Sequence, residues 1–442
     1  MNKLKYKKHR VDKYNRELNI FLNAKERRDL RRKQLFKIKK GEFVFDNIIY
    51  KPIHLEYLQN KVEYLTKHKS RIPGDGRLRL PKIFSLTENP SDSFQFLRNL
   101  LATMTNPKNK EIVIDYHMCE KISLDASVCM DIILREKISF LKELDNKSKH
   151  HKIQSIRGEK LNNIEIRKFV NSTGTNHIIN GISYDYPDVI TYDLCQGDKK
   201  EGAGKKEIEI TKLMMHVEKC LSRMGKKLNH KAKRDISTII GEVLTNAEDH
   251  STMDHRFSIG HFQESNEDNH HIGMFQLVIL NFGKTIYEKL KDPKLCKNQK
   301  IVERMKRLSS LFTKKGFLRS AAFQEETLWT LYALQEGVSS IDIKRGNGTI
   351  RFIDSFFNLK GPGIDYVSTL TILSGNTKII FDGKYEIKEV IRDDDKFKVL
   401  TFNESDSLEE KPDEKYVQHT ENYFPGTLIY TNICIKEDNI VI

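Results

Sequence analysis

The second half of the chain alternates between helical and strand-like hydrophobic patterns. Apolar residues recur at helical spacing over Thr211–Met224 and Lys231–Asp249, and strand-like runs follow at Phe257–Phe262 and Met274–Leu280. A basic, mainly helical region is expected from Tyr287 to Leu334. Further strands are predicted at Thr349–Ile353, Thr369–Leu373, Lys378–Phe381 and Thr427–Ile435, with a hairpin over Leu370–Phe381 and an acidic surface excursion over Asp393–Gln418.

The middle of the chain has the pattern of a small α/β domain. Strands are predicted at Lys82–Leu86 and Glu111–Tyr116, and helices at Ser91–Met104, Ser123–Leu144 and Ile164–Ser172. Because strands alternate with helices, we expect a partly parallel sheet.

Turn residues and composition divide the chain into four parts. His54–His68 is an expected amphipathic helix, Ile72–Gly76 a turn, and Gln196–Lys206, rich in glycine and charge, a linker. The predicted organisation is a basic, partly helical arm (1–77), an α/β domain (78–195), a linker (196–206) and a second domain (207–442).

Composition places the chain among globular proteins. Hydrophobic residues make up 38% and charged residues 31% of the 442 residues. No apolar run is long enough to cross a membrane, and the basic N-terminus lacks the apolar stretch of a secretory signal. The six cysteines include no CxxC pair, which argues against a zinc site or disulfide framework and favours a reducing cytoplasm.

Most of the net charge of +15 lies at the N-terminus. Residues 1–40 carry sixteen Lys and Arg against four acidic residues, a net charge of +12. Such an arm is expected either to contact nucleic-acid phosphates or to remain a solvated tail, and the pattern leaves both interpretations open.

The sharpest motif is Ile239–Ser251, IIGEVLTNAEDHS. Glu242 and Asn246 lie four residues apart and therefore project from one helix face. An amide oxygen can join phosphate oxygens around Mg²⁺, and a carboxylate one turn away can activate a water molecule. The alternative is an amphipathic core helix whose polar residues face solvent.

This segment resembles the N-box of GHKL (Bergerat) ATPases, in which an acidic residue precedes an asparagine by one helical turn. The resemblance implies that Glu242 is the general base and Asn246 the Mg²⁺ ligand, with Asp249 and His250 as further members of an ATP site. ATP and Mg²⁺ are the cofactors that it implies.

Later motifs follow in the family's order. Gln276–Ile286 resembles the DxGxG segment that contacts adenine and includes Asn281, Gly283 and Lys284; Asn281 replaces the acid and Thr285 the second glycine. Glu336–Ser340 resembles the lid. The second glycine box corresponds to Arg345, Gly346, Asn347 and Gly348, and the late Gly-Thr strand supplies Thr427. The likeness spans about 206–442 and implies a GHKL α/β sandwich with a mixed sheet.

The middle domain is similar to the STAS (anti-sigma-antagonist) fold. The resemblance lies in Ile112–Tyr116 and in Ile122–Ser127, which leads into a helix. It implies that Ser127 is a phosphoacceptor, although Val128 stands where the family has glycine. The alternative is that Ser127 only satisfies free N–H groups at a helix start.

Three functions are compatible with these patterns. The first is an intracellular ATPase acting as a regulatory or defence switch, in which ATP orders the segment Lys289–Arg319 as a lid and the signal reaches a protein partner or a second copy. The second is an anti-sigma-type serine kinase that acts on a STAS domain. Phosphorylation of a histidine is not expected, because His216 lies on a predicted helix of the second domain and is expected to be structural. The third is a nucleic-acid-binding ATPase that uses residues 1–40. No membrane partner is expected.

Overall fold

The protein is described by a computed structural model that covers most of residues 43–437. The described residues are 43–45, 48–50, 53–61, 64, 76–105, 111–147, 155–182, 184–199, 203–250, 252–267, 270–313, 323–335, 338, 350–354, 368–392 and 395–437. Among them, no helix has the length and apolar character needed to span a bilayer. The arm 1–40, the predicted lid residues 336–337 and 339–340, and the glycine box 345–348 lie outside the described residues.

A five-stranded sheet forms the centre of the molecule, in the order β11-β14-β10-β9-β8. Its strands are β8 (Val189–Asp198), β9 (His255–Glu267), β10 (His270–Phe282), β11 (Thr369–Phe381) and β14 (Val417–Lys436). Every neighbouring pair is antiparallel, so the prediction of a mixed sheet is wrong. The short connection from β9 to β10 permits only a hairpin, because parallel strands need a long crossover.

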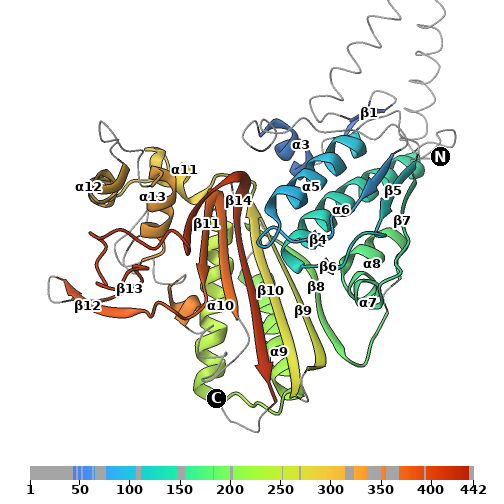
Figure 1. The fold of residues 1–442 in the computed structure, drawn as a ribbon. Coiled ribbons are helices and arrows are strands. Elements are labelled where there is room, and N and C mark those ends of the chain that lie inside the picture. The colour runs from blue at the N-terminus through green and yellow to red at the C-terminus, as the bar shows by residue number, and fades with distance from the viewer. Residues whose placement is uncertain are drawn as a thin grey trace, which may run out of the picture.

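Both faces of this sheet are buried (Figure 1). On β10, Phe275, Leu277 and Ile279 face the core formed with α9 (Ala203–Arg223) and α10 (His230–His250). The alternate residues Val278, Leu280 and Phe282 belong to the core shared with the N-terminal unit. Because successive side chains of β10 alternate between two buried layers, its sequence is a nearly continuous apolar run.

The N-terminal unit (residues 76–182) is built on short parallel strands. Strands β3 (Arg77–Arg79), β5 (Glu111–Asp115) and β7 (Ser155–Glu159) pair in parallel, as do β4 (Ile83–Phe84) and β6 (Lys121–Ile122). Its helices are α5 (Pro90–Thr105), α6 (Leu124–Lys147), α7 (Ile164–Ser172) and α8 (Gly174–Asn180). The predicted alternation of strands and helices, with parallel strand pairing, is confirmed. Before this unit lie the hairpin of β1 (Phe43–Phe45) and β2 (Ile48–Tyr50), and helix α3 (Ile53–Asn60).

The basic region after β10 forms three helices (Figure 1). These are α11 (Ile286–Lys291), α12 (Gln299–Thr313) and α13 (Glu325–Ala333). Helices α11 and α13 pack against β11, while α12 packs on α13. Trp329 is buried and donates its indole N–H to Ser309 Oγ at 3.1 Å, which joins α13 to α12. The described part of the expected lid, 289–313, is thus mainly helical, and Val302, Met305 and Leu308 of α12 are buried in the core.

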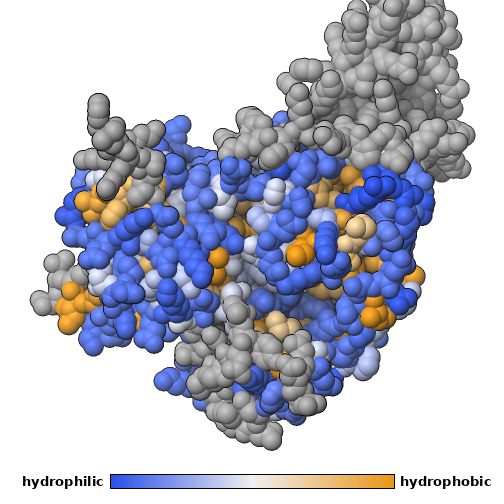
Figure 2. Space-filling model, viewed as in Figure 1, coloured by the Kyte–Doolittle hydropathy of each residue, from blue (hydrophilic) through white to orange (hydrophobic). Residues whose placement is uncertain are grey.

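The surface of the molecule is mainly hydrophilic in the view of Figure 2, with apolar side chains in small separate groups. One exposed apolar residue, Ile391, lies on β12 (Lys388–Arg392), which forms a hairpin with β13 (Asp395–Val399). In the described part of the excursion predicted for Asp393–Gln418, β13 is followed by turns and coil up to residue 416, and residues 417–418 already belong to β14.

Three local predictions are wrong. Residues 196–198 of the predicted linker belong to β8, where Gln196 pairs with Phe257 of β9, and strand pairing outweighs their loop-like composition. Residues 350–354 are helical rather than extended, because Ile350 and Ile353 reach the core from one helix face. Leu370–Phe381 is one strand, not a hairpin: Gly375, at φ +59°, absorbs a register shift within β11.

Asp131 of α6 provides a test of how this packing responds to pH. It is fully buried and accepts a hydrogen bond from Thr175 of α8. Burial raises the pKa of Asp131 to about 7, against the opposing effects of Thr175 and Arg135. The pKa of Asp131 is higher in the folded state than in the unfolded state. Its contribution to stability is therefore fully present below the unfolded pKa of 3.8, and it is lost as the pH rises from there to about 7.

We therefore expect Asp131→Asn, which keeps an acceptor for Thr175, to gain stability relative to wild type between pH 5.5 and pH 8. The gain should be on the order of 1–2 kcal/mol. Urea denaturation at the two pH values measures it. An unchanged difference between the two proteins would show that Asp131 is already ionised at pH 5.5.

Candidate functional site

Helix α10 carries the predicted catalytic pair. Its buried stripe includes Ile240, Val243 and Leu244, and the helix packs closely on α9, since a Cβ at Gly241 would lie 3.1 Å from Ile210. Outside this stripe, Glu242 and Asn246 are both partly buried, one turn apart. The Oε2 atom of Glu242 is shielded from solvent and has no hydrogen-bond partner.

The end of the sheet next to α11 places three polar side chains in a row. Asn281 of β10 is directly opposite Thr427 of β14, which is opposite Ser374 of β11. The hydroxyl oxygens of Ser374 and Thr427 lie 3.2 Å apart. Asn281 has the same strand parity as Ile279, so its side chain points to the face covered by α9 and α10.

Asn281 is only 1% exposed, and its Nδ2 has no hydrogen-bond partner. Leaving a buried amide unpaired costs about 1–3 kcal/mol. Orphaned polar groups of this kind are rare in folded proteins and are often completed by a ligand or a water molecule. The unpaired amide thus marks this end of the sheet as a candidate binding position.

Gly426 is required by the close approach of β10 and β14 at this point. It adopts φ +148°, and a Cβ there would lie 2.0 Å from the carbonyl oxygen of Asn281. The glycine of the Pro-Gly-Thr motif therefore allows Thr427 to sit directly beside Asn281.

The turn after β10 joins this row to the end of α10. Gly283 adopts φ +136°, and a Cβ on it would lie 2.7 Å from the backbone nitrogen of Thr252. The backbone N–H of Lys284 donates to Thr252 Oγ1 at 3.2 Å. Because Thr252 follows α10 by two residues, these contacts hold the C-terminal end of that helix against the turn.

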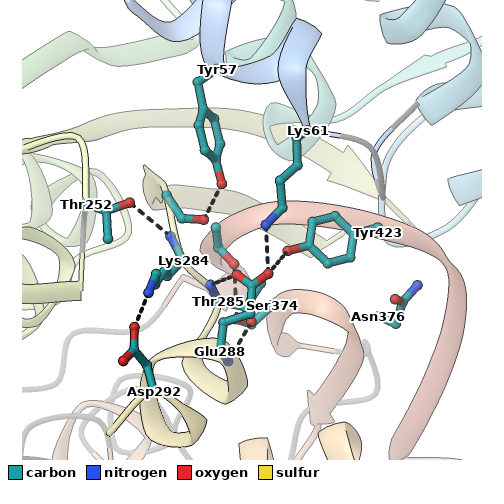
Figure 3. Close-up of polar contacts among 12 residues, drawn as sticks. Tyr57, Lys61, Thr252, Lys284, Thr285, Glu288, Asp292, Ser374, Asn376 and Tyr423 are labelled. Atoms are coloured by element: carbon teal, nitrogen blue, oxygen red, sulfur yellow. Dashed lines mark hydrogen bonds and ion pairs between the residues drawn. The ribbon is translucent and has the colours of Figure 1, made fainter. Parts of the chain in front are cut away.

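Two residues of this turn have clear structural roles. Thr285, which replaces the second glycine of the family pattern, is the N-cap of α11: its side chain accepts from the Glu288 N–H, and Glu288 accepts from the Thr285 N–H. The ammonium group of Lys284 is paired with Asp292 (Figure 3). Lys284 must leave this partner before it can contact a phosphate.

The remaining predicted residues are not all placed. The backbone of Asp249 and His250 belongs to α10, but their side chains, like Arg345, Gly346, Asn347 and Gly348, lie outside the described residues. Ser127 is the fourth residue of α6; it is fully buried, and its Oγ has no partner. A phosphoryl donor could reach Ser127 only if α6 moved.

His216 of α9 is buried, which agrees with the structural role expected for it. Its ring lies between Tyr192 and Phe275, and a Cβ at Gly260 would collide with it. Burial lowers its pKa to about 4, so the ring is neutral at physiological pH.

A buried ionic network beside the site was not anticipated from the sequence. Arg256 of β9 pairs with Glu209 of α9 and Glu248 of α10, and Lys206 also pairs with Glu248. Gly197 makes room for it, since a Cβ there would lie 2.3 Å from the guanidinium carbon of Arg256. Glu248 follows Asn246 by two residues, so the network sets the rotation of α10 at the candidate site. Charged residues far apart in sequence give no local signal of such pairing.

Comparisons with protein-family models, curated proteins and solved structures found no match to this chain.

The close approach at Gly426 predicts a sharp penalty for any side chain there. Gly426→Ala should destabilise the protein by roughly 1–3 kcal/mol or more, because the methyl group meets the Asn281 carbonyl at an unfavourable φ. Urea denaturation measures the loss. Gly204→Ala is the matched control: Gly204 is exposed in α9 with open space around it, and its substitution should be neutral or slightly stabilising. Equal effects at the two positions would contradict the packing described for Gly426.

Proposed function

We propose that the chain binds ATP with Mg²⁺ between α10 and the Asn281 end of the sheet, and that it hydrolyses ATP as a nucleotide-driven regulatory or defence switch. The observation that carries this proposal is the buried, unpaired amide of Asn281 beside Thr427, at the sheet end next to which α10 terminates. It occurs where the GHKL resemblance expects the adenine contact.

The side chains present suit this ligand. An asparagine offers one acceptor and two donors, which complement the amino group and a ring nitrogen of adenine. Thr427 adds a hydroxyl group on the same face of the sheet. The unpaired Oε2 of Glu242 can accept the proton of an attacking water, and Asn246, one turn along, offers an amide oxygen to a cation. Bound Mg²⁺ would neutralise phosphate charge.

The burial of both unpaired atoms favours a switch. Glu242 Oε2 and Asn281 Nδ2 are shielded from solvent, so a nucleotide reaches them only after neighbouring groups move. Binding is then coupled to a change in conformation, and its free energy can shift the balance between two states. Phosphorylation of Ser127 is less well supported, since that hydroxyl is buried in α6.

The first test of this proposal separates binding from hydrolysis. Glu242→Gln should bind ATP with unchanged affinity, while the rate of phosphate release falls on the order of 10²- to 10⁴-fold. Asn246→Ala should weaken Mg²⁺-dependent binding. Calorimetry measures binding, and a phosphate-release assay measures hydrolysis. The control is Glu218→Gln, which changes a partly exposed carboxylate of α9 that pairs with Lys233. Normal turnover by both site variants would refute the catalytic assignment.

The second test concerns the base. Asn281→Leu removes the amide at similar volume, and ATP affinity should fall on the order of 10- to 100-fold, because the adenine edge loses its partner. Asn171→Leu alters an amide that donates to Tyr186, away from the site, and should leave affinity unchanged. If Asn281→Leu binds ATP as wild type does, adenine does not occupy this position.

A further inference from the structure

We propose that Tyr57 and Lys61, contributed by the N-terminal segment, are positioning residues for the nucleotide site and couple nucleotide binding to helix α3. This inference rests on the proposed function. It starts from a contact between regions far apart in sequence: the end of α3 lies on the turn Gly283–Glu288, which joins the Asn281 strand to α11 (Figure 3).

The first contact fixes the backbone of the turn. The hydroxyl of Tyr57 donates a hydrogen bond to the carbonyl oxygen of Gly283 at 2.5 Å. Gly283 has a left-handed φ of +136° and packs against Thr252 at the end of α10. Tyr57 therefore restrains Gly283, the residue that follows β10 and packs against Thr252 at the end of α10.

The second contact fixes the start of α11. Lys61, one turn after Tyr57, donates to Glu288 Oε1 at 2.7 Å and lies over the ring of Tyr423, whose hydroxyl also donates to Glu288 at 3.0 Å. Burial works to raise the pKa of Glu288, but the hydrogen bonds from Lys61, Thr285 and Tyr423 hold it below its usual value. The carboxylate is thus kept charged, in the form that binds Lys61 and caps α11.

A continuous set of hydrogen bonds runs from this turn to the candidate site. The backbone N–H of Ile286 donates to Ser374 Oγ at 3.0 Å, and the Ser374 hydroxyl donates to the Gly426 carbonyl oxygen at 3.0 Å. Ser374 Oγ also lies 3.2 Å from the hydroxyl of Thr427, which is directly opposite Asn281. A movement of α3 would therefore be transmitted to the position proposed for adenine through the turn, Ser374 and Thr427.

Other polar clusters make weaker candidates. The orphaned atoms of Ser127, Asp131 and Tyr116 belong to buried residues of the N-terminal unit that are packed among the apolar side chains of its core. The exposed cations of α12, such as Lys300 and Arg304, form a charged helix face, and no described residue beside it points to a particular partner.

The coupling has a direction. With α3 docked, the turn is held before nucleotide arrives, and binding does not have to order it. By thermodynamic reciprocity, nucleotide must also strengthen the docking of α3 to the same extent. Since α3 follows the basic segment 1–40 in the chain, this gives the nucleotide state a route to that segment.

The experiment measures the affinity of Mg²⁺·ATP for the full chain by calorimetry. Tyr57→Phe removes only the hydroxyl, and Lys61→Gln removes the charge; each should weaken binding on the order of 5- to 50-fold. Lys61→Arg should restore most of the affinity, because it keeps a cation for Glu288. Lys82→Met, which removes an exposed lysine paired with Glu120, is the control and should bind as wild type.

Hydrogen exchange tests the reciprocal effect. In wild type, nucleotide should slow amide exchange over Ile53–Lys61, and Tyr57→Phe should abolish this protection, a readout that loss of stability alone would not produce. Unchanged or tighter ATP binding by Tyr57→Phe and Lys61→Gln, or an α3 exchange rate indifferent to nucleotide, would overturn the coupling while leaving the proposed function standing. A wild-type chain that binds no nucleotide would instead remove the function on which the coupling rests.

Discussion

The structure depends on a five-stranded antiparallel sheet that is buried on both faces. Strand β10 supplies Phe275, Leu277 and Ile279 to the core with α9 and α10, and Val278, Leu280 and Phe282 to the core with α5 and α6. Because alternate side chains belong to different layers, neither layer can slide without disturbing the other. Helix α10, which carries the candidate catalytic pair, and the N-terminal unit therefore both pack against the same strand.

Such double burial leaves few places for polar side chains, and those present must be satisfied. Arg256, Glu209 and Glu248 meet this requirement in large part by pairing with one another, although the Nε atom of Arg256 has no hydrogen-bond partner. Removing one of these buried partners would be costly. Asn281 and Glu242 do not meet the requirement, since each keeps a shielded atom without a partner. These two atoms lie where the sequence motifs place a nucleotide, and that coincidence is the physical basis for the proposed nucleotide site.

The turn after β10 connects these elements. Gly283 contacts the chain two residues after the end of α10, and Glu288 lies in the first turn of α11. Gly283 accepts a hydrogen bond from Tyr57 of α3, and Glu288 accepts one from Lys61, the residue after α3. Thr285 has a structural role in this turn: its side chain caps α11, which a glycine at that position could not do. The site and the N-terminal segment are thereby joined through a turn that several hydrogen bonds hold in place.

The sequence by itself determined the elements with strong local patterns: α7, the long helix α10 with Glu242 and Asn246 on one face, and the apolar strands β5 and β10. Helical spacing and apolar runs are local properties, so they can be recognised from the sequence alone. Tertiary structure alone decided the antiparallel order, the inclusion of Gln196–Asp198 in β8, the single strand through Gly375 and the helical state of 350–354. It also decided which polar groups found partners. Pairing between distant strands and the burial of individual atoms depend on contacts that no local window contains.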